Sequence, residues 1–153
     1  MAIFPLFKPK PFFSAEEQKQ IVDAIRHAEQ QTSGEIRVYV ESKNPLVNVV
    51  ERAEEVFYKL KMDHTEHRNG VLIYVAVKHK EFALFGDEGI YKATGQEYWS
   101  HTAASVIAAI NGNSLVNGIE KAIGMIGDAL KEKFPYERTT DKNELPDEIV
   151  FGR

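Results

Sequence analysis

The chain of 153 residues contains no cysteine. This absence excludes disulfides, thiolate catalysis and zinc sites built on cysteine, and it is compatible with the cytosol. Positive charge is also scarce, because the formal net charge is -4. Nucleic-acid-binding proteins usually carry a basic face, and anionic membranes attract basic segments. We therefore expect no nucleic-acid partner and no membrane partner.

Long hydrophobic runs are missing as well. No window approaches the roughly 18 apolar residues of a membrane span. In the segment Met1–Phe13 the run Lys8-Pro9-Lys10-Pro11 interrupts the apolar residues, and the basic residues follow the apolar ones instead of preceding them as in a signal peptide. We expect a cytoplasmic monomer. The chain also shows no phosphate loop and no nucleophile beside an obvious base, so the residues alone indicate no reaction.

The stretch Asn69–Gly86 is the centre of the expected fold. Seven apolar residues, Val71–Val77, follow an Asn-Gly turn signal and predict a strand buried on both faces. Residues Glu81–Gly86 alternate in polarity, and only Lys78-His79-Lys80 separates the two runs. The pattern predicts an antiparallel hairpin.

A second strand is expected at Glu35–Glu41, where strict alternation places Ile36, Val38 and Val40 on one face and leaves the other face partly wet. Residues Val47–Met62 carry an apolar stripe at helical spacing. Strand, helix and central strand then form a right-handed βαβ unit with parallel strands.

Further helices flank this unit. A capping box at Ser14 and Glu17 starts the first helix, which Ser33-Gly34 is expected to stop. Residues 86–90 are expected as a loop, and two helical patterns follow, from Gly95 to about residue 111 and from Leu115 to Leu130. The sequence predicts a three-layer α/β/α sandwich around a small mixed sheet. We expect an N-terminal arm at 1–13, one domain at 14–134 and an extended tail at 135–153 packed on it.

Two acidic loops are candidate cation sites. Asp63, His64, Glu66 and His67 offer four potential ligands within five positions, although their spacing matches neither an EF-hand nor a zinc motif. A solvated polar loop is the alternative interpretation of this stretch.

Asp87 and Glu88 follow strand 81–86, whose end must lie beside the start of the central strand. Glu35 begins at the same edge, and converging carboxylates in loops suit a hard cation such as calcium. Alternatively, Asp87 caps the following turn or pairs with Arg68. Arg68 and Thr65 are the candidate contacts for a phosphate or another anion.

Three segments together resemble the TPM domain, the fold shared by the TLP18.3, Psb32 and MOLO-1 proteins. They are Thr32–Ile36, RNGVLIYVA at Arg68–Ala76, and FALFGDEGI at Phe82–Ile90. The resemblance covers about residues 14–134, and the tail Asp141–Ile149 resembles the ending of short, soluble members without a membrane anchor. It implies a Rossmann-like α/β/α sandwich, calcium binding in the acidic loops, and the acid-phosphatase activity claimed for a plant relative.

Three functions follow, in descending order of preference. The first is a regulatory or structural module that binds a divalent cation, with calcium as the expected ion, through Asp87, Glu88, Asp63, Glu66 and Glu35. The second is a protein-interaction module that docks an unidentified protein through the apolar arm Phe4–Phe13 and Ile149–Phe151. The third is a weak metal-dependent acid phosphatase, in which the cation would polarise the phosphoryl group and Arg68 would neutralise its charge. No catalytic residue is assigned.

Overall fold

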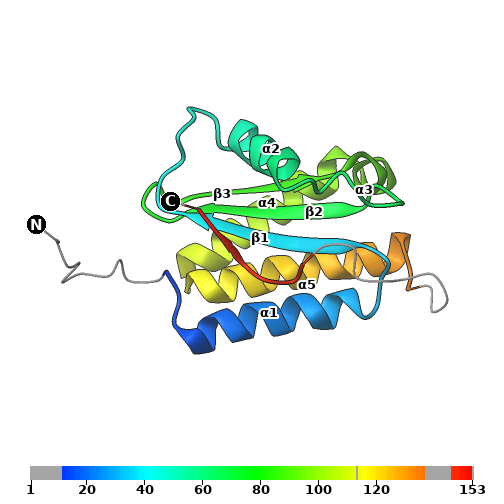
Figure 1. Ribbon diagram of the computed structural model, residues 1–153, viewed down its shortest axis with the longest axis horizontal. Helices are drawn as coiled ribbons and strands as arrows, with labels where there is room; N and C mark the ends of the chain where they lie inside the picture. The colour runs from blue at the N-terminus through cyan, green and yellow to red at the C-terminus, as the bar shows by residue number, and fades with distance from the viewer. Residues whose placement is uncertain (1–11, 113, 137–145, 153) are drawn as a thin grey trace, which may run out of the picture.

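The computed structural model describes residues 12–112, 114–136 and 146–152. Most of the expected N-terminal arm, at 1–11, and the tail residues 137–145 lie outside this description. No helix in the described ranges is long and apolar enough to cross a membrane. Within these ranges, five helices and four strands follow one another (Figure 1): α1 Ala15–Glu29, β1 Glu35–Glu41, α2 Val49–Lys59, β2 Gly70–Ala76, β3 Glu81–Gly86, α3 Glu88–Thr94, α4 Gln96–Gly112, α5 Leu115–Lys133 and β4 Val150–Phe151.

The four strands form one mixed sheet in the order β3-β2-β1-β4. β1 and β2 are parallel, with Glu35 opposite Gly70 at the start of both strands. β2 and β3 are antiparallel, with Val71 opposite Gly86, so the predicted hairpin and βαβ unit are both present. β4 adds a short parallel pairing on the outer side of β1.

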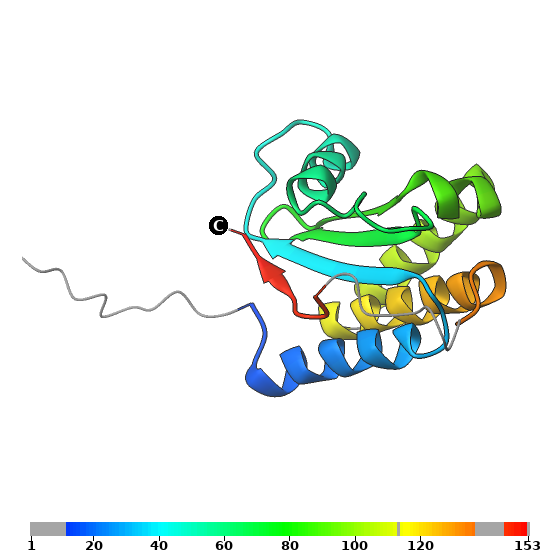
Figure 2. The same cartoon turned by 45° about the vertical axis from the view of Figure 1, so that its right-hand side comes forward.

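Helices cover both faces of the sheet. α2 lies on one face, and α1, α4 and α5 lie on the other, as two views of the ribbon show (Figures 1 and 2). The larger apolar core fills the space between the sheet and the three-helix layer, whereas a smaller core with Phe57, Leu72 and Tyr74 lies under α2. The predicted α/β/α sandwich is confirmed.

The prediction that one face of β1 is partly exposed to solvent is wrong, because all seven residues of the strand are buried. α2 covers this face and brings Arg52 to Glu41, the carboxylate that ends the strand. The alternation Glu-Ile-Arg-Val-Tyr-Val-Glu resembles that of a solvated strand, but the strand is covered and the charge of Glu41 is paired with Arg52 within the protein.

The helix boundaries differ from the expected ones in two places. α1 ends at Glu29, four residues before Ser33, and α2 is shorter at each end than the stripe 47–62. Residues 86–90 are not a loop throughout, since the Asp87 carboxylate accepts the Glu88 N–H at 2.8 Å and caps the short helix α3. The sequence does not indicate α3, because the second residue of this helix is Gly89 and glycine is a poor helix former. A Cβ at that position would lie 2.2 Å from the His67 carbonyl oxygen, so this close approach requires glycine.

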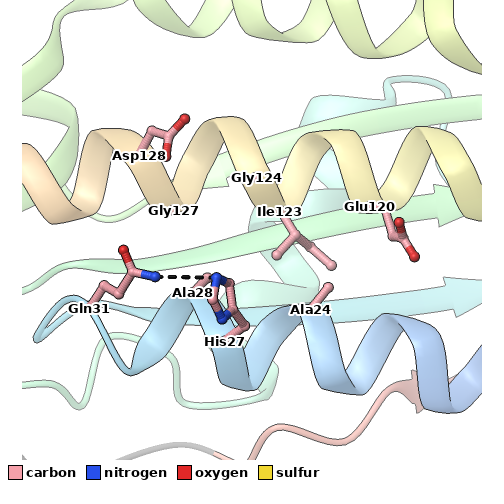
Figure 3. Close-up of a pocket in the computed structure, with 9 residues that line it drawn as sticks. All are labelled: Ala24, His27, Ala28, Gln31, Glu120, Ile123, Gly124, Gly127 and Asp128. Carbon is pink, nitrogen blue, oxygen red and sulfur yellow. Dashed lines mark hydrogen bonds between the residues drawn. The ribbon is translucent and has the colours of Figure 1, made fainter.

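α1 and α5 lie side by side on the same face of the sheet and run in the same direction (Figures 1 and 3). Ala24 and Ile123 line one small hollow of about 160 Å³ between the two helices. One turn further along, a Cβ on Gly127 would lie 3.0 Å from the Ala28 Cβ, so glycine here allows close contact of the helices. The start of α1 therefore lies beside the start of α5.

Candidate cation site

The acidic residues expected to converge do lie at one end of the sheet. Glu35 opens β1 opposite Gly70, and the Gly70 carbonyl oxygen accepts the Asp87 N–H at 2.9 Å from the other side. β2 therefore separates Glu35 from Asp87. The structure arranges the carboxylates of this edge as two groups.

The first group surrounds Arg68. Its guanidinium donates to both Asp87 oxygens, from Nε to Oδ2 at 2.7 Å and from Nη2 to Oδ1 at 2.8 Å. Asp87 is buried, whereas Glu88 is exposed and approaches Nη1 of Arg68 at 3.4 Å. The hydrogen bonds to Asp87 raise the pKa of Arg68 above its usual value. Because the guanidinium holds both Asp87 oxygens, a cation at this carboxylate would have to displace Arg68.

The loop before β2 adds less to this group than the sequence predicts. Asp63 is half-buried and lies 3.8 Å from His64, and Glu66 is exposed. The Thr65 hydroxyl, expected to contact an anion, is buried and accepts the Asn69 N–H at 3.3 Å. This hydroxyl holds the loop in place.

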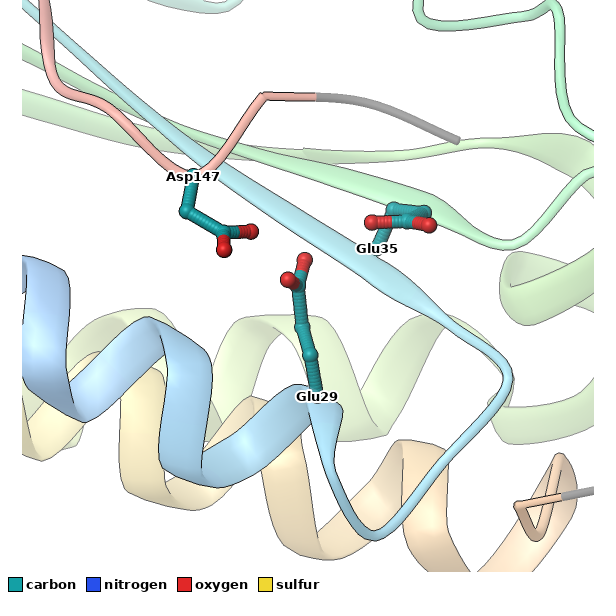
Figure 4. A group of neighbouring side chains, drawn as sticks. All are labelled: Glu29, Glu35 and Asp147. Carbon is teal, nitrogen blue, oxygen red and sulfur yellow. The ribbon is translucent and has the colours of Figure 1, made fainter. Parts of the chain in front are cut away.

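The second group contains three carboxylates, those of Glu29, Glu35 and Asp147. One oxygen from each lies within 4.8 Å of the other two. Glu29 points from the end of α1 into the gap between the other two side chains, with Glu35 on β1 and Asp147 on the tail (Figure 4). Glu35 is 2% exposed. The end of α1, the start of β1 and the distant tail thus place three acidic side chains together; we call them the carboxylate cluster.

The electrostatics of the carboxylate cluster disfavour three negative charges. Burial, followed by hydrogen bonds to Asp147 and Glu35, raises the pKa of Glu29 to about 11. The Ile36 N–H holds the Oε2 atom of Glu29 at 2.9 Å and acts in the opposite direction. Without a cation, Glu29 is therefore the group that retains a proton at neutral pH.

Two arginines border the carboxylate cluster. Arg26 Nε lies 3.6 Å from Asp147 Oδ2, which is longer than a hydrogen bond, and the Arg26 side chain is largely exposed. Arg37 is buried and is attracted by Glu148 and Glu29, although burial dominates and lowers its pKa. The Oδ1 atom of Asp147 is buried without a hydrogen-bond partner among the described residues. Neutralisation here is weaker than around Asp87.

Sequence reasoning missed Glu29 and Asp147. Glu29 lies on a helix face where an exposed glutamate is ordinary, and the one available signal was its position just before the turn that leads to Glu35. Asp147 belongs to a segment without periodicity, so no pattern placed it beside β1.

The sequence and the fold of the chain are both similar to those of known proteins. The family model of the TPM domain matches residues 7–129. The chain belongs to the TPM domain family. A search of curated proteins found no match to it.

Solved structures agree with this assignment. The NMR structure of the BA42 protein from the psychrophilic bacterium Bizionia argentinensis is 44% identical, with a TM-score of 0.85, covering 95% of this chain and 99% of that chain. The N-terminal domain of a P. gingivalis protein, at 10% identity and a TM-score of 0.65, covers 80% of this chain and 78% of that one. A Corynebacterium glutamicum N-terminal domain, at 11% identity and 0.61, covers 95% of both. The last two show the fold alone.

The donor set of this TPM domain fits a hard cation. Calcium takes six to eight oxygen ligands at about 2.3–2.6 Å in flexible geometry, whereas magnesium demands a near-ideal octahedron. Three carboxylates offer up to six oxygens, and the Asp147 oxygen without a partner is among them. The chemistry of the carboxylate cluster therefore suits calcium better than a transition metal, which would favour imidazole or thiolate ligands.

Proposed function

We propose that this TPM domain binds a divalent cation, calcium in the first place, through Glu29, Glu35 and Asp147, and that the ion has a regulatory or structural role. One observation carries the proposal: oxygens of three carboxylates from α1, β1 and the tail lie within 4.8 Å of one another. Like charges this close together, one of them buried and two partly buried, favour the uptake of protons or of a cation.

The structural role proposed for the ion follows from the three parts of the fold that carry its ligands. A cation shared by Glu29, Glu35 and Asp147 would bridge the end of α1, the start of β1 and the tail next to β4. A ligand that binds only the native state adds RT ln(1 + [L]/Kd), about 2.7 kcal/mol at 100 times Kd. Calcium would therefore stabilise the domain and fix the tail against it.

The acidic loops predicted from the sequence stay a competing location for the ion. They include Asp63, Glu66, Asp87 and Glu88, and the family resemblance implies calcium in such loops. The guanidinium of Arg68 competes with a cation for the Asp87 oxygens. We therefore place the carboxylate cluster first.

Amide chemical-shift mapping and thermal melts with added calcium or magnesium test the proposal. We expect shifts around residues 29–36 and 146–150, and a melting temperature that rises with calcium. Glu29→Gln and Asp147→Asn should abolish both effects, whereas the matched variant Glu88→Gln should retain them. A melting temperature unchanged by millimolar calcium, without shifts in these residues, would refute the proposal.

The other two functions, a protein-interaction module and a weak metal-dependent acid phosphatase, stay predictions. In a phosphatase the cation would have to polarise the phosphoryl group while a donor neutralised it. Arg68, the predicted donor, is engaged by Asp87. Slow, cation-dependent turnover of an aryl phosphate is the most that this arrangement supports.

A further inference from the structure

A second feature lies at the opposite end of β2 from the carboxylate cluster. A groove of about 430 Å³ runs between the β2–β3 hairpin and the helices α4 and α5. We call it the hairpin groove; its apolar lining includes Val75, Val77, Phe82, Ile107, Ile110 and Leu115.

The hairpin groove leaves apolar surface in contact with water. Ile107 is 44% exposed, and Val77, Phe82, Ile110 and Leu115 are only half-buried. Contiguous exposed apolar surface of this kind commonly marks a binding site, because covering it is favourable by about 25 cal/mol per Å². The groove therefore fits a short apolar segment.

The described chain begins at the same end of the sheet as this groove, but beside β4: the rings of Phe12 and Phe13 each lie 6.3 Å from that of Phe151. Phe13 is buried in the same core as Val116 at the start of α5, and Phe12 packs against that core. Because α1 and α5 run in the same direction, the residues before α1 emerge beside the N-terminal end of α5. Leu115, at this end of α5, lines the groove on the side toward α4.

Eleven residues precede Phe12, and their composition matches this location. The segment carries Phe4, Leu6 and Phe7, followed by Lys8-Pro9-Lys10-Pro11. Residues before proline favour extended conformations, and four extended residues, the length of Lys8–Pro11, would span roughly 12 Å at about 3.1 Å per residue. Phe151, beside Phe12, and Val75, in the groove, both pair with Val40 of β1. Two strand spacings of about 4.8 Å separate them, so a linker of this length reaches the groove.

We propose that the hairpin groove is the docking site of the chain's own residues 1–11, with Phe4, Leu6 and Phe7 against its apolar lining. A short linker gives an effective concentration in the millimolar range. The segment of the same chain therefore outcompetes that of a second copy, or a separate partner at micromolar concentration. The inference is independent of cation binding.

The absence of cysteine permits a direct test in the full chain. A nitroxide on Ala2→Cys is the only label that such a chain can carry. We expect it to broaden the amide signals of Val77, Phe82 and Leu115, to the same extent at all protein concentrations. Residues 35 and 70, at the far end of the sheet, should keep their intensities.

Two variants control the result. Ile107→Asp changes a half-exposed position in the groove and should reduce the broadening, whereas Val47→Asp, at a fully exposed position before α2, should not. Phe4→Ser with Phe7→Ser should act as Ile107→Asp does. Unbroadened groove amides would overturn the proposal. Broadening that appears only when labelled chains are mixed with isotope-labelled chains without the nitroxide would assign the groove to a second copy and also overturn it.

Discussion

Glu35 and Glu41 open and close the same strand, and they are 2% and 3% exposed. At Glu41 the carboxylate accepts two hydrogen bonds from Arg52, at 2.8 and 2.9 Å, and a third from the Tyr74 hydroxyl. At Glu35 the neighbours are two further carboxylates. At the end of β1 the charge of Glu41 is neutralised by Arg52, whereas at its start Glu35 lies beside two other acidic side chains.

The pKa values follow this difference. Burial raises the pKa of Glu41, but the hydrogen bonds from Arg52 and Tyr74 outweigh it, and the pKa lies below its usual value. At the other end, burial and the neighbouring carboxylates raise the pKa of Glu29 to about 11. Burial of a carboxylate alone therefore does not mark a ligand site. A buried acid that is fully paired within the protein stabilises the fold, whereas buried acids that face one another require a proton or a cation.

The largest effect should come from removing the neutralising partner. Arg52→Met leaves Glu41 buried without its guanidinium, which costs about 3 kcal/mol of unfolding free energy by analogy with other buried pairs. Urea unfolding at pH 7 measures the loss. Glu55→Gln is the matched control, because Glu55 also bonds Arg52 but is half exposed, and it should cost about 0.5 kcal/mol or less.

The same variant changes the acid response. Because the pKa of Glu41 is lowered in the folded state, its contribution to stability is present above its unfolded value of 4.5 and is lost as the pH falls through the folded value. Arg52→Met should remove this loss. An equal acid destabilisation in wild type and variant would contradict the assignment.

A smaller effect is expected from the tail. Removing residues 139–153 deletes Asp147, together with Ile149 and Val150, which pack partly buried against the two cores. Partial burial of two aliphatic side chains corresponds to about 2 kcal/mol. Thermal and urea unfolding of the truncated chain measure the loss. Asp147→Asn separates the carboxylate from this packing and, in chelator, should cost much less than the truncation; unaltered stability of the truncated chain would show that the tail contributes no packing.

The carboxylate cluster should respond to pH in the sense opposite to that of Glu41. The folded pKa of Glu29 exceeds its unfolded value, so in chelator stability is complete below pH 4.5 and decreases as the pH rises toward 11. Glu29→Gln keeps the shape of the side chain without the charge. We expect it to raise the unfolding free energy at pH 8 by about 1 kcal/mol or more, because the wild type must take up a proton on folding at this pH and the variant need not.

Urea midpoints at pH 5 and pH 8 in chelator measure this change, and Glu17→Gln, at the exposed start of α1, should leave the pH dependence as it is. Calcium should reverse the loss at pH 8 in wild type alone. A Glu29→Gln chain that loses stability between pH 5 and pH 8 as wild type does would contradict the raised pKa.

The sequence predicted β1, β2 and β3 almost to the residue, because alternation, an apolar run and turn signals are local properties. The helical layers followed from apolar stripes in the same way. The carboxylate cluster did not follow, since Glu29 and Asp147 are 118 positions apart in the sequence and meet only in the folded chain. Long-range partners such as Glu41 and Arg52 were missed for the same reason: charges on an alternating strand predict solvent, and only the position of α2 shows that they are paired.

The smallest effect should come from the acidic loop that the sequence favoured. If the ion binds the carboxylate cluster, Asp87→Asn and Glu88→Gln will leave the calcium affinity within about twofold of wild type, a difference below roughly 0.4 kcal/mol. Asn at position 87 retains an oxygen that can cap α3, and Glu88 is exposed, so both variants should fold. Isothermal titration with calcium measures the affinity, with Asp147→Asn as the variant expected to lose it. The opposite pattern, binding lost in Asp87→Asn and retained in Asp147→Asn, would place the ion at the loop. Arg68 would then have to release both Asp87 oxygens, and the amide shifts on adding calcium would centre on residues 68 and 87 instead of 29 and 36.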